Sequence, residues 1–307
     1  MQVSESIRAY LAWGAVCFFW GTTYLAIRIG VEVLPPALFA GIRFIVAGSI
    51  FTTVLRMRGY ALPARGELAD IAIVGIALLT VANGMVVWAE QWVPSGLAAL
   101  IVATLPFWIV GIEAVLPRGD RLNPRKVIGI VIGFSGLIIL LWPEIKGSID
   151  SAYLIGILAM FIAPVSWGGG SIYSKYRKIN TPPLMAAAFQ MLFGGTVLIV
   201  IGLASGEVDR FAPNPQGIAA IAYLIIFGSI VGYGSFMFAL SKLPASFVST
   251  YAYINPVIAV ILGWFILDER LDWMLVLAMI LILLGVILVQ SGALRVTTNR
   301  PDRCASP

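Results

Sequence analysis

Apolar runs of about 20 residues follow one another along the chain, separated by short turns that carry proline, glycine or charge. An α-helix needs a run of this length to cross the ~30 Å hydrocarbon core of a bilayer. Ten spans are predicted, near residues 10–29, 36–57, 68–89, 94–116, 124–142, 152–174, 183–203, 216–240, 244–267 and 273–292. The first has no small-residue cleavage pattern after it and is expected to be retained. The sequence therefore predicts an all-α polytopic membrane protein with ten transmembrane helices.

Composition narrows the function classes. Charged residues make up 11% of the 307 residues, against roughly 25% in soluble domains. The chain has no histidine, which removes the commonest metal ligand and proton shuttle. Its two cysteines, Cys17 in an apolar span and Cys304 in the tail, are not placed for a structural bridge. We expect no cofactor, no metal site and no nucleic-acid partner. The net charge of +5 is attributed to the basic residues that set the orientation in the membrane.

The distribution of Lys and Arg over the turns predicts the orientation. With the N-terminus in the cytoplasm, fifteen basic residues lie on the cytoplasmic side: Arg8, Arg56, Arg58, Arg65, Arg118, Arg121, Arg125, Lys126, Lys175, Arg177, Lys178, Lys242, Arg295, Arg300 and Arg303. Four lie on the opposite side, namely Arg28, Lys146, Arg210 and Arg270. The positive-inside rule therefore predicts that both termini are cytoplasmic.

The two halves of the chain repeat each other. Pro94 and Pro106 recur 150 positions later as Pro244 and Pro256, and Trp20-Gly21 recurs as Trp167-Gly168. Five spans per half is an odd number, so the second half must enter the membrane from the opposite face. The loop charges agree, because the basic stretch at 118–126 corresponds to the acidic stretch at 268–272. We expect two inverted repeats, at residues 1–147 and 148–293, and a disordered cytoplasmic tail at residues 294–307.

The prolines inside the fourth and ninth spans are candidate hinges. Pro106 and Pro256 each follow the span-opening proline by twelve residues, about 18 Å along a helix at ~1.5 Å per residue. At that depth an interior proline interrupts the backbone hydrogen bonds and frees a carbonyl that a substrate could use. The alternative is a packing kink whose freed carbonyl a neighbouring hydroxyl satisfies.

Aromatic and amide side chains lie deep in the central spans, away from the interfacial belt where tryptophan gathers. Walls of this kind suit an amphipathic solute, especially an aromatic ring, although each residue alone could simply pack between helices. The predicted lining comprises Trp20, Tyr24, Asn83, Trp88, Trp108, Trp167, Gln190, Tyr233, Tyr251, Tyr253 and Asn255.

Arg43 is a basic residue inside a predicted span, about seven residues from its start. An intramembrane charge is costly enough to need a role. Arg43 could bind a substrate carboxylate in a forked geometry, brace two helices, or extend towards the near interface. The sequence leaves these roles open.

Several of these residues together carry a family resemblance. The Trp-Gly of the first span with Arg28 eight residues later, Arg43-Phe44 and the fourth-span proline are similar to the EamA half of the drug/metabolite transporter superfamily. The acid before the last helix and the final Gly-(Leu/Val)-Ile complete the pattern, twice over nearly the whole chain. Asp120 and Gln190 depart from it, at positions where glutamate and a second arginine are usual. The resemblance implies ten helices and export or exchange of small metabolites, and the tryptophan-rich lining resembles the aromatic amino-acid exporters of this superfamily.

The sequence thus predicts an inner-membrane carrier that exports or facilitates movement of amino acids, including aromatic ones, or related metabolites by alternating access. The cavity is expected between spans 1–4 and 6–9. A channel is the alternative, and a membrane-embedded enzyme is disfavoured because no catalytic constellation is visible. Without histidine or paired buried acids, downhill or exchange transport is expected rather than proton coupling. The small-residue face of Gly129 and Gly133 could pack within the chain or form a weak homodimer, so we expect a monomer or a weak homodimer.

Overall fold

The computed structural model describes residues 5–117, 122–146, 150–177, 179–243, 245–248 and 250–298. Within these ranges the chain is helical and forms no β-strand. Five spans are single α-helices: α1 (Glu5–Val31), α2 (Pro36–Met57), α7 (Pro124–Lys146), α8 (Ser151–Tyr176) and α9 (Pro183–Ala204). The last span, α14 (Trp273–Thr298), is also continuous. The remaining four spans are divided into segments.

Two of the divided spans contain a π-helical segment. The third span comprises η1 (Arg65–Glu67), α3 (Leu68–Gly75), the π-helix η2 (Ile76–Asn83) and α4 (Gly84–Ala89). The eighth comprises α10 (Pro215–Tyr223), the π-helix η4 (Leu224–Val231) and α11 (Gly232–Lys242), and η3 (Glu207–Arg210) precedes it. The fourth span consists of α5 (Ser95–Val102) and α6 (Leu105–Val115), and the ninth of α12 (Ala245–Val248) and α13 (Tyr251–Leu267).

Nine helical stretches within the described residues are long and apolar enough to cross a bilayer. In the ninth span, α13 is shorter, at 17 residues, and α12 precedes it. Each predicted span thus corresponds to helix, which confirms the polytopic all-α fold. α14 extends to Thr298, a few residues into the predicted tail, and the disorder of the tail stays a prediction. Residues 299–307, with Cys304, lie outside the described part of the chain.

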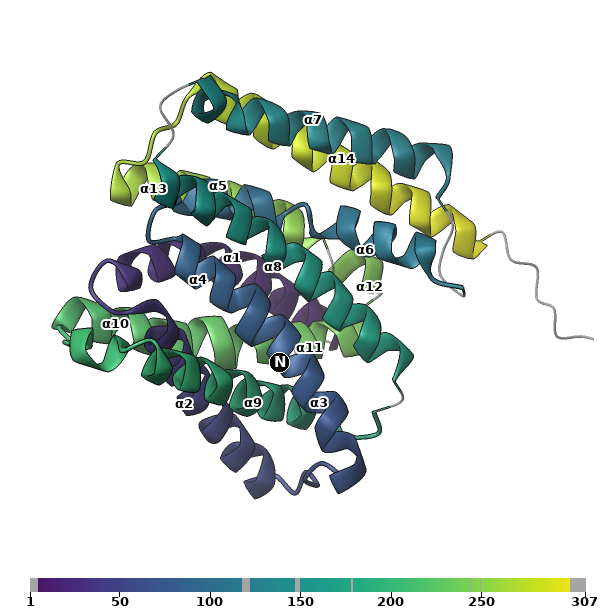
Figure 1. Ribbon diagram of the computed structural model, residues 1–307. Coiled ribbons are helices and arrows are strands. Elements are labelled where there is room, and N and C mark those ends of the chain that lie inside the picture. The colour runs from purple at the N-terminus through teal and green to yellow at the C-terminus, as the bar shows by residue number, and fades with distance from the viewer. Residues whose placement is uncertain are drawn as a thin grey trace, which may run out of the picture.

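Corresponding helices of the two repeats pack against each other. The most extensive contacts join α7 to α14 and α2 to α9, and α7 and α14 form a peripheral layer beside the other helices (Figure 1). At Gly129 a Cβ atom would lie 2.6 Å from the backbone oxygen of Gly285, so the small-residue face allows α7 and α14 to pack closely. The glycine face predicted from the sequence is therefore used within the chain.

The two π-helices also correspond, since η4 follows η2 by 148 positions. Side chains from other helices bind carbonyls inside both segments. Ser166 Oγ donates to the Ala77 carbonyl at 2.8 Å, and Trp20 Nε1 donates to the Gly228 carbonyl at 3.0 Å. Tertiary contacts thus support a wider helical register at matching places in the two repeats.

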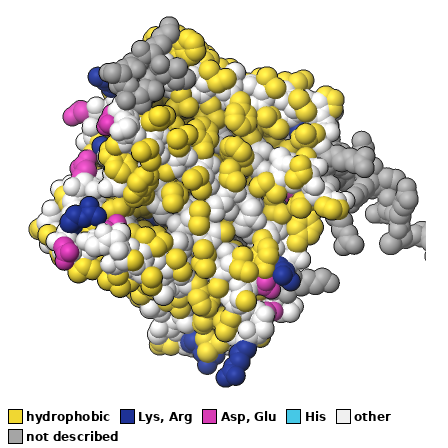
Figure 2. All heavy atoms as spheres, viewed as in Figure 1, with side chains coloured by type: hydrophobic (Ala, Val, Ile, Leu, Met, Phe, Trp, Pro, Cys, Tyr) yellow, Lys and Arg dark blue, Asp and Glu magenta, His cyan; other side chains and the backbone are white. Residues whose placement is uncertain are grey.

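Hydrophobic side chains cover a broad face of the molecule, while charged side chains gather towards its margins (Figure 2). Val131 on α7, Leu158 on α8 and Ile287 on α14 are among the large exposed apolar residues. A surface of this kind suits contact with lipid.

The bundle has two ends, which are named here by a residue of each. The Glu90 end contains the α1–α2 turn, residues 90–94 and residues 268–272. The Asp70 end carries ion pairs between Arg177 and Asp70 (3.3 Å) and between Lys175 and Glu113 (2.7 Å). The Lys/Arg distribution predicts that the Glu90 end faces away from the cytoplasm.

Candidate functional site: a central cavity between the repeats

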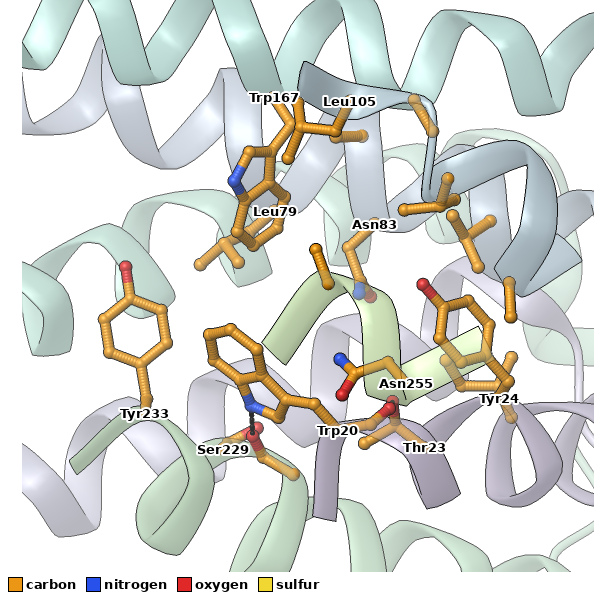
Figure 3. Close-up of a pocket in the computed structure, with 18 of the residues that line it drawn as sticks. Trp20, Thr23, Tyr24, Leu79, Asn83, Leu105, Trp167, Ser229, Tyr233 and Asn255 are labelled. Carbon is orange, nitrogen blue, oxygen red and sulfur yellow. Dashed lines mark hydrogen bonds between the residues drawn. The ribbon is translucent and has the colours of Figure 1, made fainter. Parts of the chain in front are cut away.

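A cavity of about 130 Å³ lies between the two repeats. Its lining residues come from spans 1–4 and 6–9, as the sequence predicts, and none of them belongs to α7 or α14. The predicted binding residues that line it are Trp20, Tyr24, Arg43, Asn83, Trp167, Tyr233, Tyr251 and Asn255. Figure 3 shows Asn83 and Asn255 between the two tryptophans, Trp20 and Trp167, on one side and Tyr24 on the other.

Four predicted residues do not line the cavity. Trp88 packs edge-on against Trp92, with ring centroids 4.9 Å apart. Trp108 lies edge-on to Phe134 of α7, and its indole nitrogen donates to Thr104 Oγ1 at 3.1 Å. Tyr253 donates to the Val286 carbonyl of α14 at 3.5 Å. Hydropathy alone did not show that Trp108 and Tyr253 are turned towards neighbouring helices, or that Trp88 packs against the turn that follows its own span.

Gln190, the fourth of them, lies directly behind the cavity wall. It is buried on α9, and its Oε1 accepts a hydrogen bond from the Tyr233 hydroxyl at 3.3 Å. Because Tyr233 lines the cavity, Gln190 can orient that phenol without touching a bound solute. Its position corresponds to that of Arg43 in the first repeat, so the two repeats place different chemistry there.

The helix break lies directly before the predicted proline in the fourth span and several residues before it in the ninth. In the fourth span α5 ends at Val102 and α6 begins at Leu105, so Pro106 occupies the first turn of α6, where its missing N–H costs little. In the ninth span the break lies between α12 and α13, and Pro256 is inside α13 on the cavity wall. Pro244 lies outside the described residues. The two candidate hinges are therefore not equivalent in structure.

Arg43 both braces the bundle and presents a free donor. Its side chain is 5% exposed, and Nε donates to Ser229 Oγ of η4 at 3.0 Å. The guanidinium carbon lies 4.8 Å from the centre of the Phe44 ring. Nη1 is buried and has no hydrogen-bond partner among the described residues. A buried donor without a partner costs about 1–3 kcal/mol, so an anionic or carbonyl group bound here would be favoured.

The cavity wall also holds two amide side chains, Asn83 and Asn255, and one of them has an unpaired hydrogen-bond acceptor. Asn83 Oδ1 is buried and has no hydrogen-bond partner within the described residues. The Asn255 amide, oriented to satisfy its neighbours, donates to the carbonyls of Cys17 (2.9 Å) and Tyr251 (3.0 Å). Two residues of the cavity wall thus hold unpaired groups, a donor on Arg43 and an acceptor on Asn83. Such a pair suits a solute that has both an acceptor and a donor.

The aromatic part of the wall is anchored by Trp20. Its ring lies edge-on to Tyr251, with centroids 5.0 Å apart, and 5.3 Å from Phe236 of α11. The indole N–H is already used by Gly228 of η4, so Trp20 offers its ring face rather than a hydrogen bond. Apolar walls with a few placed polar groups are typical of small-molecule sites.

The sequence prediction missed several lining residues, among them Thr23, Phe44, Met191 and Ser229. Ser229 is the informative one, because it is the partner of Arg43. A lone hydroxyl inside the apolar run Leu224–Val231 is the signal that could have identified it. Among the described residues no group of three or more Cys, Asp or Glu side chains is placed to hold a metal ion.

The helical membrane fold and the cavity shared by two repeats are those of a membrane transport protein. The EamA-like transporter family model matches residues 7–142 and 154–291, and the chain belongs to that family. The uncharacterised inner membrane transporter YedA of Escherichia coli strain K12 is 36% identical over 294 residues, which cover 95% of this chain and 94% of YedA. The uncharacterised transporter YoaV of Bacillus subtilis strain 168 is 25% identical, over 89% of this chain and 93% of YoaV.

A solved crystal structure of a protein has the same fold. Its TM-score is 0.66 at 22% identity, over 95% of this chain and the whole of the solved chain. The family membership, the inner-membrane relative and the apolar helices together identify a multi-pass inner-membrane transporter.

Proposed function

We propose that the chain is a carrier for amino acids or closely related amphipathic metabolites, which it exports or exchanges by alternating access. The observation that carries this proposal is the pair of unsatisfied polar groups on two residues that line one cavity, Arg43 Nη1 and Asn83 Oδ1. A carboxylate is the natural partner of a guanidinium, and an ammonium group is a natural partner of an amide oxygen. An α-amino acid carries both.

The size and walls of the cavity limit the rest of the solute. A volume of about 130 Å³ is close to that of the ~150 Å³ apolar cavity that accommodates benzene. Trp20, Trp167 and Tyr233 supply apolar and aromatic surface for a side chain. The proposed substrates are therefore single amino acids with apolar or aromatic side chains rather than peptides.

The fold supports a carrier cycle. The cavity is shared by inverted repeats, and rocking one repeat against the other can open it to each side in turn. With both termini in the cytoplasm, as the Lys/Arg distribution predicts, the Asp70 end faces the cytoplasm, where exported amino acids are loaded. The ion pairs at that end must open when substrate enters from the cytoplasm.

The direct test is transport by the purified chain in proteoliposomes. A panel of radiolabelled amino acids and small metabolites is tested for uptake, with and without the same compound inside. Saturable uptake that is accelerated by internal substrate identifies a carrier and its substrates. Flux that does not saturate would indicate a channel, and no flux of any amino acid would contradict the proposed substrate class.

A further inference from the structure

Glu90 is a buried acid that the proposed function leaves unused. It follows Ala89, the last residue of α4, and its side chain is 0% exposed. Neither carboxyl oxygen has a hydrogen-bond partner among the described residues. The sequence places Glu90 in a short turn and gives no reason to expect burial, so the expectation that the chain lacks a suitable buried acid is wrong.

Glu90 does not line the cavity itself but lies one helical turn beyond a residue that does. Leu79, Asn83 and Val86 line the cavity from the third span, at spacings of four and three residues. Glu90 follows Val86 by four residues and so continues the same helical face by one turn. Tyr24, on the opposite wall, is an electrostatic neighbour of Glu90.

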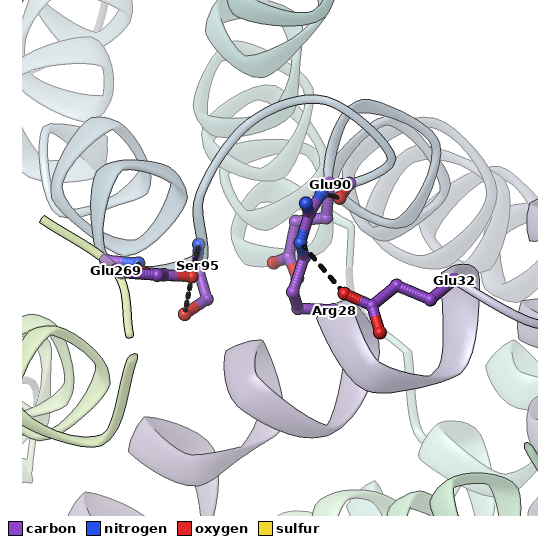
Figure 4. A network of polar contacts seen from close by, with 6 residues as sticks. Arg28, Glu32, Glu90, Ser95 and Glu269 are labelled. Carbon is purple, nitrogen blue, oxygen red and sulfur yellow. Dashed lines mark hydrogen bonds and ion pairs between the residues drawn. The ribbon is translucent and has the colours of Figure 1, made fainter. Parts of the chain in front are cut away.

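Figure 4 shows Arg28 beside Glu90, Glu32 on the far side of Arg28, and Glu269 next to Ser95. An Arg28 Nη1 N–H donates to the Glu90 backbone carbonyl, and Arg28 Nε lies 3.8 Å from Glu32. Glu269 is held at the start of α5, where it accepts from Ser95 N (2.7 Å), Ser95 Oγ (2.8 Å) and Gly96 N (3.0 Å). The nearby cation is thus bound to a backbone oxygen and to another acid, and the nearby carboxylate has partners of its own.

The elements packed around this end offer few other ionisable groups. α1 contributes Tyr24, Arg28 and Glu32, and the 268–272 loop contributes Glu269. α8 packs along α4 and carries Asp150 and Tyr153 at its start, and the start of α2 is capped by Glu207. α5 is apolar apart from Ser95.

These surroundings disfavour an ionised Glu90. Burial raises the pKa of the Glu90 carboxyl well above its usual range, the Glu269 carboxylate raises it further, and Arg28 partly opposes both. In the arrangement seen here these surroundings favour the protonated form of the carboxyl. A cationic group that enters the cavity would oppose these effects and stabilise the carboxylate.

We propose that Glu90 is the proton-binding site of the carrier and exchanges one inward proton for each substrate molecule exported. The proposal rests on the proposed function and adds the coupling ion to it. With the cavity open to the outside, a proton from external water binds the Glu90 carboxylate as substrate leaves. With the cavity open to the cytoplasm, the proton returns to water through the cavity, and the carboxylate then attracts the ammonium group of the next substrate. Proton and substrate compete because an ionised Glu90 favours a cationic group and a neutral one does not.

The first test needs no substrate. Infrared difference spectra of the purified full chain are recorded during a pH titration, for wild type and for Glu90→Gln. We expect a protonated-carboxyl band in wild type at neutral pH that is lost at alkaline pH and is missing from Glu90→Gln. Glu113→Gln is the matched control, since Glu113 is ion-paired with Lys175 at the other end of the bundle. A Glu90 carboxylate that is already ionised at neutral pH would overturn the proposal.

The second test measures coupling in proteoliposomes that contain a pH-sensitive dye. A substrate gradient should drive protons in the opposite direction in wild type and in Glu113→Gln. In Glu90→Gln the substrate-driven proton movement should be lost, while exchange of labelled for unlabelled substrate continues. Substrate flux without proton movement in wild type would refute the coupling and leave the proposed function intact. If no amino acid is transported, the proposed function fails, and the infrared titration still decides whether Glu90 binds a proton.

Discussion

Glu67 and Glu207 perform the same task in the two repeats, each for a helix of the other repeat. The Glu207 carboxylate accepts hydrogen bonds from Ala37 N (3.3 Å) and Leu38 N (2.8 Å) at the start of α2. The Glu67 carboxylate accepts from Asn180 N (2.7 Å) and Thr181 N (3.0 Å) just before α9. Because α2 and α9 pack along each other, both ends of this helix pair are tied by an acid from the opposite half. A negative charge at a helix start is favourable, since it binds unpaired N–H groups and complements the helix dipole.

Removing the buried one of these charges should lower stability. Glu207→Gln is expected to lower the free energy of unfolding by about 1 kcal/mol, because the amide is a weaker acceptor for the two N–H groups. Glu67→Gln should have a smaller effect, since Glu67 is less buried than Glu207 and water can reach its partner Asn180. Thermal unfolding in detergent measures both, with Glu5→Gln, an exposed acid paired with Lys242, as the control. Unchanged melting of Glu207→Gln would show that this cap is not important for stability.

Arg43 should bind substrate through its charge and its forked shape. Losing a charge-assisted hydrogen bond costs about 1.5–3 kcal/mol, so Arg43→Gln should weaken apparent affinity by about 10-fold to 100-fold. Arg43→Lys keeps the charge and should lose less. Ser229→Ala removes the brace at Nε but leaves Nη1, so it should affect stability more than affinity. Saturation curves of flux per inserted molecule separate these effects, and wild-type affinity in Arg43→Gln would leave bracing as the role of this residue.

The two prolines should behave differently. Pro106→Ala is expected to retain near wild-type flux, because a proline in the first turn of α6 replaces no hydrogen bond. Pro256→Ala should straighten α13 and reduce flux, because this proline lies within the helix and on the cavity wall. Initial rates of counterflow for each variant and for the double variant decide the matter. Equal losses in both single variants would restore the idea of two equivalent hinges.

Arg28 should set the pH dependence of transport. Its positive charge favours the ionised form of Glu90, so Arg28→Gln should raise the pKa of Glu90 further. At a given pH a smaller fraction of Glu90 is then ionised, and the flux–pH curve should move to higher pH. Flux measured at a series of equal internal and external pH values provides the test. A shift to lower pH would mean that Arg28 and Glu90 are not coupled as described.

The predicted orientation can be tested chemically. Leu62→Cys and Leu271→Cys place exposed thiols at opposite ends of the bundle, in a chain from which Cys17 and Cys304 have been removed. A membrane-impermeant maleimide added to intact cells should label position 271 and leave position 62 unlabelled. Labelling of both positions from outside would contradict the inverted architecture, and labelling of position 62 alone would reverse the orientation.

Hydropathy was sufficient to predict the spans because each span is a continuous run of apolar residues that can be read from the local sequence. The predicted span at 36–57 coincides with Pro36–Met57, and most other boundaries differ by a few residues. The π-helices were not predictable in this way, since their register depends on partners from other helices, such as Ser166 for the Ala77 carbonyl.

The candidate site was only partly predictable, for a similar reason. A deep tryptophan such as Trp20 had to face either the cavity or a neighbour, and the sequence could not say which. Trp108 and Tyr253 face neighbouring helices instead. The burial of Glu90 depends on α1 and the 268–272 loop meeting over the end of α4, a long-range arrangement that no local pattern encodes.

The pairing of α7 with α14 has a consequence for how the chain is made. α7 is complete when about half of the polypeptide has been synthesised, whereas its glycine-matched partner is the last helix to leave the ribosome. Since domains generally form from the N-terminus during synthesis, the Gly129 face of α7 must wait in lipid until translation ends. α2 waits in the same way for α9. The first five spans therefore form an assembly intermediate in which the contact surfaces of α7 and α2 have no partner. A membrane-resident chaperone or the insertion machinery has a defined surface to shield during that interval.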